Sequence, residues 1–96
     1  MSFLKSLFGR RRGDAAEVPT PAGEPLMHNG FTIQATPYKS GGEYQTAGVI
    51  WKEIDGVRRE HHFVRAERHA SREAAIAFAL TKGRQIIDER GEHVFD

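Results

Sequence analysis

The stretch with the densest set of chemically active side chains reads REHHFVRAERHASREAA, in which His61, His62 and His69 lie near Glu60 and Glu67. Imidazole and carboxylate groups are ligands that proteins offer to zinc. Neighbouring residues of a strand point to opposite faces, so His61 and His62 cannot hold one ion together. Only Glu60 and His62 share a face, and two ligands are fewer than the three or four of a zinc site. We therefore predict no metal site and no cofactor.

No motif for catalysis stands out. The serines fall in a tail, a loop and an expected helix cap, and none lies in the pattern of a nucleophile with an adjacent base and an oxyanion donor. The segment KSGGE contains two glycines but lacks the following lysine and serine of a phosphate-binding loop. We predict a non-enzymatic protein without a small-molecule substrate and without catalytic residues.

The length of the chain limits the size of the fold, and its charges determine the electrostatic potential around it. The chain has 96 residues, 14 Lys and Arg against 13 Asp and Glu, and no cysteine. This length allows one small domain with one core. The near balance of charge gives no strong field for nucleic acid or membrane, and the lack of cysteine fits a reducing cytoplasm. We therefore expect a cytoplasmic protein.

Residues 1–27 are expected to form a flexible segment ahead of a domain at 28–96. The opening MSFLKSLFG has the spacing of a short amphipathic helix that ends at GRRRG. Residues 15–25 contain three prolines and too few apolar side chains to offset the cost of ordering them. The apolar run is too short for a signal peptide, and no later run could span a membrane. Contact of the opening residues with an anionic membrane surface is a less favoured alternative.

Alternating apolar residues predict three strands. The first covers residues 31–36, and two more flank Asp55-Gly56, a dipeptide typical of a type I′ hairpin turn. Counting outward from this turn gives the register. The expected pairs are Ile54 with Val57, Glu53 with Arg58, Lys52 with Arg59, Ile50 with His61, Gly48 with Phe63 and Thr46 with Arg65.

A long helix is expected to follow the strands. Ser71 can cap its start and Gly91 can end it. The apolar side chains fill one arc of the helix, and Gly83 near the centre of that arc would let the helix approach the sheet, at about 1 kcal/mol of helix propensity. Val94 and Phe95 should fold back over the core. The predicted class is α+β: a three-stranded antiparallel β-meander packed on one long C-terminal α-helix (β-β-β-α), with a flexible N-terminal tail.

One helix can cover only one face of the sheet. The other face carries Val49, Trp51 and Val64, whose apolar side chains need a partner. The candidates are the N-terminal segment and a second copy of the chain, and we predict self-association through this face.

Nucleic-acid binding would depend on arginines in two places. The candidate phosphate contacts are Arg10, Arg11 and Arg12 in the tail and Arg58 and Arg59 on the third strand. Glutamates alternate with the strand arginines, so the summed positive potential is weak. A single long helix with a wide buried face cannot supply a helix-turn-helix motif.

From about residue 30 to 95 the chain resembles the small bacterial family named for the HlyU transcriptional activator. The resemblance rests on AGVIWKEIDG, HHFVRAE and KGRQIIDERGEHVF, and the opening MSFLKSLFG is also similar to the starts of such proteins. The residues that match the family signature are Gly48, Phe63, Arg65, Ala66, Glu67, Ile86, Ile87, Asp88 and Gly91. The chain departs from the pattern at Glu67 and Gly83, where aspartate and alanine are commoner.

The resemblance implies a regulator of transcription, with DNA or a protein of the transcription machinery as its partner. Two hypotheses follow. The protein either contacts DNA phosphates through its arginines, or it is a homodimeric protein-interaction module without nucleic-acid binding. A regulator that acts through protein contacts satisfies both the resemblance and the balanced charge. Arg65 and Glu67 are candidates for a functional pair or for an ion pair that joins strand to helix.

Overall fold

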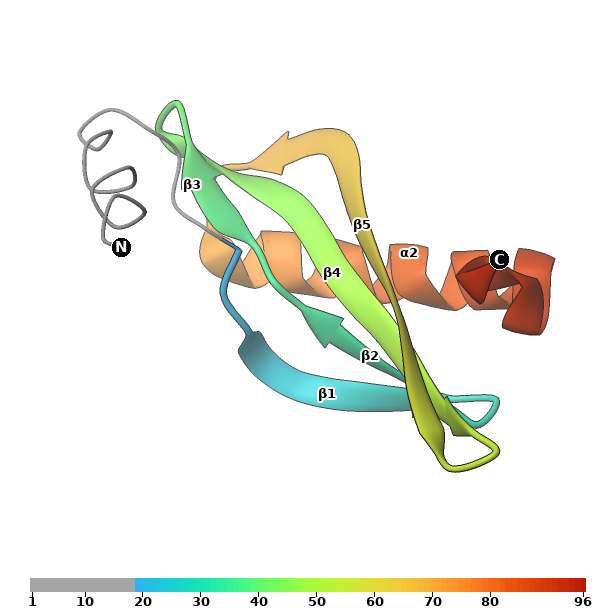
Figure 1. Cartoon of the computed structure of the whole chain (residues 1–96). Coiled ribbons are helices and arrows are strands. Elements are labelled where there is room, and N and C mark those ends of the chain that lie inside the picture. Colours follow the sequence, from blue (N-terminus) through green and yellow to red (C-terminus); the bar gives the residue numbers. More distant parts are fainter. Residues whose placement is uncertain (1–18) are drawn as a thin grey trace, which may run out of the picture.

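The computed structural model describes residues 19–96 as one antiparallel sheet followed by a C-terminal helix (Figure 1). The elements are β1 (Ala22–His28), β2 (Phe31–Ala35), β3 (Tyr38–Ser40), β4 (Glu43–Ile54), β5 (Val57–His69), α2 (Arg72–Arg90) and the 3₁₀ helix η1 (Gly91–Phe95). The predicted α+β class, with its antiparallel sheet and single long C-terminal helix, is confirmed. The short amphipathic stretch predicted near the start lies outside the described residues.

The long strand β4 organises the sheet. Along one edge it pairs with β2 and then with β3, while β1 continues the sheet beyond β2. Its other edge pairs with β5 from Ile54–Val57 to Tyr44–His69. Strands β1 and β5 therefore lie at opposite edges of the sheet, and the short strand β3 also has one unpaired side.

Tight turns with positive φ connect the strands. Asp55 and Gly56 have φ angles of 53° and 78°, as a type I′ turn requires, so the predicted hairpin is confirmed. Asn29 and Gly30 repeat this turn with φ angles of 51° and 84° and join β1 to β2.

In residues 19–96 the sheet has five strands instead of the expected three. Residues 22–27, which the sequence analysis placed in the flexible segment, form β1 together with His28, because an Asn-Gly turn folds them back on β2. The second added strand, β3, has only three residues and owes its conformation to pairing with β4.

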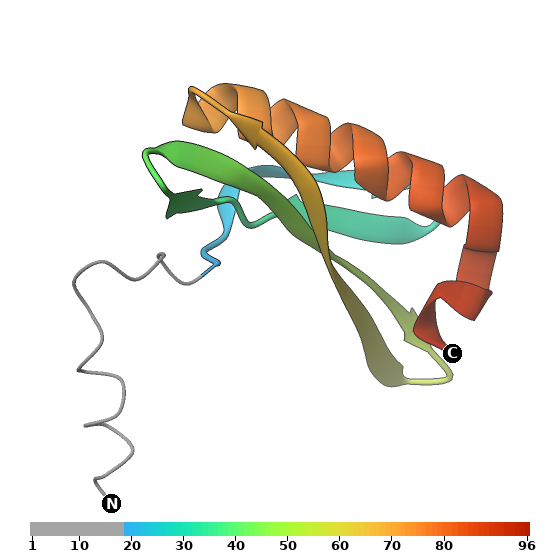
Figure 2. The ribbon, with the colours of Figure 1, turned by 90° about the horizontal axis from the view of Figure 1, so that it is seen from above.

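One face of the sheet is covered by α2, which crosses it diagonally (Figure 2). The helix begins where Ser71 accepts a hydrogen bond of 3.1 Å from the backbone N–H of Ala74, and it ends where the N–H of Gly91 bonds the carbonyl of Ile87. Both predicted caps are confirmed. The core between helix and sheet consists of Phe31, Ile33, Ile50, Phe63, Ile86, Ile87 and Val94.

Gly83 lies at a close contact between the helix and Ile33 of the sheet. A Cβ at this position would be 2.6 Å from Cγ2 of Ile33, which is fully buried. The sequence expectation for Gly83 is therefore confirmed. Beyond the helix, η1 closes the end of the core with the buried Val94 and with Phe95, whose ring centroid lies 5.9 Å from that of Phe31.

Candidate functional site

Gly48 and Phe63, the first pair of signature residues, pack against each other. The two residues are partners across β4 and β5, as predicted. A Cβ on Gly48 would lie 2.6 Å from Cζ of Phe63 and 3.0 Å from the backbone oxygen of Gln34. Only glycine leaves room for the phenyl ring to lie on the neighbouring strand and enter the core. The pair therefore builds the sheet face on which α2 packs.

The next signature residues, Arg65, Ala66 and Glu67, lie where the hairpin register changes. The pairs run as predicted as far as Ala47 with Val64, after which Gln45 faces Arg68. The strand β5 therefore contains extra residues here, and the predicted pair of Thr46 with Arg65 is wrong. Such a bulge bends a strand and strengthens its twist.

Two buried side chains of β4 satisfy the backbone of the bulge. Gln45 donates from Nε2 to the carbonyl of Arg65, and Thr46 donates from Oγ1 to the carbonyl of Glu67 at 3.0 Å. Further bonds from Arg68 to Gln45, at 3.1 Å, and between His69 Nε2 and Thr46 Oγ1, at 3.1 Å, complete the cluster. The motif thus holds a local backbone shape.

The side chains of Arg65 and Glu67 are both exposed. Within residues 19–96 neither takes part in an ion pair, so the proposed link from strand to helix is not formed there.

Replacing Thr46 by valine is expected to destabilise the fold by about 1 to 3 kcal/mol, because the carbonyl of Glu67 and the ring of His69 lose their partner inside the protein. Urea unfolding followed by circular dichroism measures the change. Thr32→Val is the matched control, since Thr32 is only half-buried. Equal stability of Thr46→Val and wild type would contradict the structural role of the bulge contacts.

The helix-end signature also serves the scaffold. Ile86 and Ile87 lie in the core, and Gly91 has the positive φ of 55° that a helix terminus needs. The carboxylate of Asp88 accepts hydrogen bonds from the β1–β2 turn, 2.8 Å from His28 Nε2 and 3.2 Å from Asn29 Nδ2. This contact ties the end of α2 to the edge of the sheet.

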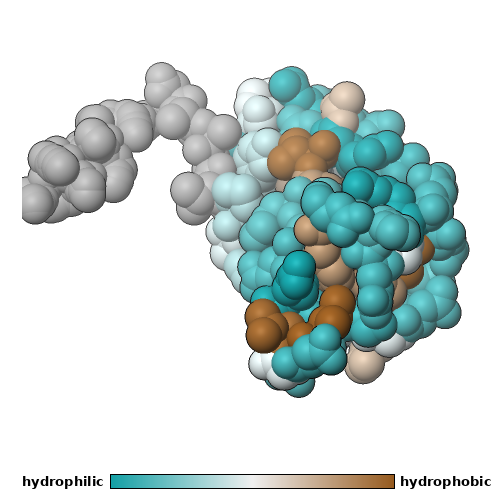
Figure 3. Space-filling view, turned by 45° about the vertical axis from the view of Figure 1, so that its right-hand side comes forward, coloured by the Kyte–Doolittle hydropathy of each residue, from teal (hydrophilic) through white to brown (hydrophobic). Residues whose placement is uncertain are grey.

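The second face of the sheet carries the predicted dimer residues. Val49 is 8% exposed and lies between Gln34 and His62, whereas Val64 is 58% exposed. The half-buried Trp51 ring has the Arg58 guanidinium 4.3 Å above it. The three residues share a face but are not one exposed patch, and Figure 3 shows hydrophobic surface broken up by hydrophilic side chains. Self-association through them stays a prediction.

Arg58 and Arg59 point to opposite faces of β5. Arg58 donates from Nε to Glu60 at 2.8 Å, so its ion-pair partner is the next residue but one on its own strand and not Glu53, the partner expected across the hairpin. Arg59 lines a surface pocket of about 300 Å³ between the hairpin and η1. The structure does not bring the two arginines together. Residues 10–12 lie outside the described part of the chain.

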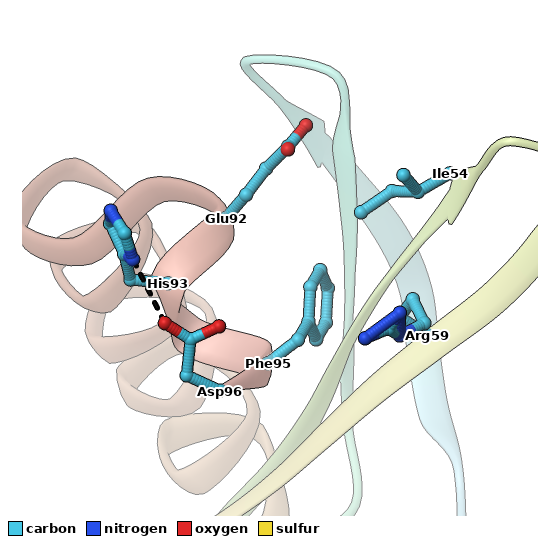
Figure 4. A pocket seen from close by; sticks show the side chains of 6 residues that line it. All are labelled: Ile54, Arg59, Glu92, His93, Phe95 and Asp96. Carbon is cyan, nitrogen blue, oxygen red and sulfur yellow. Dashed lines mark hydrogen bonds and ion pairs between the residues drawn. The ribbon is translucent and has the colours of Figure 1, made fainter.

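The same pocket contains acidic and apolar groups (Figure 4). Ile54 and Phe95 form its apolar side, and the carboxylates of Glu92 and Asp96 already bind Lys52 and His93 at 2.8 and 2.9 Å. Among the lining residues His93 and Asp96 bind each other, and Glu92 binds Lys52 outside the pocket. The residues that line the pocket do not combine a nucleophile with an adjacent base and oxyanion donors, as a catalytic site would.

The three histidines of the opening motif are separated. His62 lies 3.2 Å from Glu60 on the face of the sheet that α2 does not cover, called the open face below, as predicted. His69 packs on Phe78 with ring centroids 5.1 Å apart. His61 lies on the helix side. Within residues 19–96 no group of three or more histidine and acidic side chains could hold a metal ion.

Two pKa values are displaced on β5. Hydrogen bonds from His62 and Arg58 lower the pKa of Glu60. Desolvation lowers the pKa of His61 from 6.5, and the nearby charges of Arg90 and His62 act in the same direction. His61 therefore resists protonation in the folded protein.

The lowered pKa of His61 predicts a stability loss on mild acidification. As pH falls below 6.5, the unfolded chain takes up a proton on this residue before the folded chain does, so stability falls until the folded pKa is passed. His61→Gln should remove this part of the pH dependence between pH 7.5 and 5, above the range in which Glu60 titrates. Thermal unfolding at several pH values measures it. Identical pH profiles for variant and wild type would contradict the prediction.

The fold is a small α+β domain, and the polar groups described above stabilise this fold. Within the described residues no helix is long and apolar enough to cross a membrane. The chain matches the family model "Transcriptional activator HlyU" over residues 2–95, and it belongs to this family. The family is one of regulators of transcription. Among curated proteins and among solved structures no significant match was found.

Proposed function

We propose that this protein regulates transcription in the cytoplasm by binding another protein of the transcription machinery through the open face of its sheet. The family supports the regulatory role, and the observation that supports the mode of action is a row of neighbouring side chains on that face. Met27 is 71% exposed and pairs with Thr32, which in turn pairs with Trp51, so the three side chains form a row across β1, β2 and β4. A flat row of this kind, ending in an aromatic ring, suits a protein partner.

The charges of the hairpin do not favour reading of DNA. Strands β4 and β5 with their turn carry five basic and five acidic residues, which are Lys52, Arg58, Arg59, Arg65 and Arg68 against Glu43, Glu53, Asp55, Glu60 and Glu67. Proteins that bind DNA phosphates concentrate positive charge on one surface.

The helix is equally unsuited to the major groove. A recognition helix presents the side chains of one face to the bases while a second helix positions it. In the described residues α2 lies flat on the sheet and buries Ala75, Ala79, Gly83, Ile86 and Ile87. This geometry supports action through protein contacts.

Met27→Lys tests the proposal, because it places a charge in the row without disturbing the core. Transcript profiles are compared between cells that lack the protein and cells supplied with wild type, Met27→Lys or the control Ala77→Lys, which alters an exposed apolar residue on α2. The proposal expects Met27→Lys to behave like the deletion and Ala77→Lys like wild type. Full regulation by folded Met27→Lys would count against the open face.

A further inference from the structure

The two long edge strands of the sheet, β1 and β5, differ in how they are protected, while the third edge strand, β3, has only three residues. Strand β1 has seven residues, contains Gly23 and Pro25, and loses register between Ala22 and Leu26. Strand β5 has thirteen residues and keeps a regular register from Val57 to Val64. In the described residues its only strand partner is β4, and no other strand runs along its outer side in Figure 1. Proteins usually block long regular edges, because they recruit further strands.

The turn determines which backbone groups of β5 point outward. In a type I′ turn the residues on either side of the two-residue loop, Ile54 and Val57, bond each other through their backbones. Bonded and non-bonded pairs then alternate along an antiparallel ladder. The odd-numbered residues from 57 to 63 therefore bond to β4. The N–H and C=O groups of Arg58, Glu60, His62 and Val64 point away from it.

We propose that a second copy of this chain pairs with this edge, antiparallel, about a two-fold axis at His61. Symmetric pairing through the outward groups requires even-numbered residues to face even-numbered residues. Centring the axis on Glu60 would oppose two glutamates and set Arg58 against His62. Centring it on His62 would oppose Arg59 and Arg65, and centring it on Arg59 would oppose two arginines and leave a short ladder.

The axis at His61 sets neither two carboxylates nor two arginines opposite each other. Glu60 of each copy faces His62 of the other, and Arg58 faces Val64, whose exposed methyl groups the arginine side chain covers. The side chains of Glu60 and His62 already approach to 3.2 Å within one chain. The same two side chains could therefore also contact each other across the axis. About eight backbone hydrogen bonds would form across the axis.

This pairing goes beyond the proposed function and does not depend on it. It leaves the row of Met27, Thr32 and Trp51 uncovered. Because the axis is perpendicular to the sheet, the open faces of both copies lie on the same side of one extended sheet. A partner protein would then meet two such rows.

Single cysteines test the register, since the chain has none of its own. At the axis, His61 faces itself in a non-bonded pair with a Cα separation of about 4.5 Å, within the range of a disulfide. Glu60→Cys, His61→Cys and His62→Cys each report one register, and Glu89→Cys on the exposed side of α2 gives the background rate. Under mild oxidation His61→Cys should form covalent dimers fastest, roughly tenfold above background.

Light scattering after size-exclusion chromatography gives the second readout. Wild type should be a dimer, and Glu60→Lys should weaken it roughly tenfold, because it removes the two carboxylates that would accept hydrogen bonds from His62 across the axis and adds two positive charges next to Arg58 and Arg59. Glu89→Lys makes the same charge change away from β5 and should leave the dimer intact, with circular dichroism verifying the fold of both variants. A monomeric wild type at high concentration would overturn the proposal. So would fastest cross-linking at Glu60→Cys or His62→Cys, or a rate at His61→Cys equal to background.

Discussion

Replacing Phe63 by alanine is expected to lower the free energy of unfolding by about 3 to 5 kcal/mol. Its ring is 7% exposed, lies on Gly48 and belongs to the core that joins β5 to the rest of the sheet and to α2. Removal leaves a cavity that the glycine opposite cannot fill. Denaturant unfolding of wild type and variant measures the loss.

Val64→Ala is the matched control for Phe63→Ala. Val64 is the next residue of β5 but points to the open face and is 58% exposed. Its replacement should change stability by no more than about 0.5 kcal/mol. If Phe63→Ala cost as little as Val64→Ala, the signature phenylalanine would have no architectural role.

Ile33→Ala is expected to cost about 2 to 5 kcal/mol, because Ile33 is fully buried between the centre of the sheet and α2. Gly83→Ala alone should also destabilise the protein, since its new methyl group would lie 2.6 Å from Ile33 Cγ2, although alanine gains about 1 kcal/mol of helix propensity.

The double variant tests the close approach of helix and sheet directly. With Ile33 shortened, the methyl group at position 83 has space, so the double variant should lose less stability than the two single variants together. Unfolding free energies of the four proteins provide the cycle. Strict additivity would show that α2 and β2 are not packed as closely as described.

The sequence was informative where local chemistry decides the structure. The Asp55-Gly56 turn determined its own hairpin, and the alternation beyond it gave the correct partners as far as Val64. Ser71 and Gly91 marked the ends of the helix, and Gly83 marked its contact with the sheet. Each of these features depends on the conformational preference of one or two residues.

Strand β1 was missed because its composition resembles a linker. Of its residues only Leu26 packs against the core, and the strand depends on pairing with β2 and on contacts with α2. The Asn29-Gly30 turn was a local signal of a hairpin, of the same kind as Asp55-Gly56, and it could have revealed the strand.

Other features of the candidate site arise from contacts between distant residues. The bulge at Arg65–Glu67 depends on Gln45 and Thr46 of another strand, and the bond from His28 to Asp88 joins residues sixty positions apart. The face shared by Val49, Trp51 and Val64 was correctly inferred from alternation. The burial of Val49 was not, because it depends on the packing of neighbouring side chains.

Titration of labelled duplex DNA with the full chain, at about 50 and 200 mM salt, tests most directly the claim that this regulator acts through protein contacts. The account predicts weak binding, with a Kd no tighter than about 1 µM, and a shallow dependence on salt. Tight binding that weakens by a thousandfold or more over this range would contradict it. Arg58→Ala/Arg59→Ala and a triple replacement of Arg10, Arg11 and Arg12 by alanine would then show which arginines contact the phosphates.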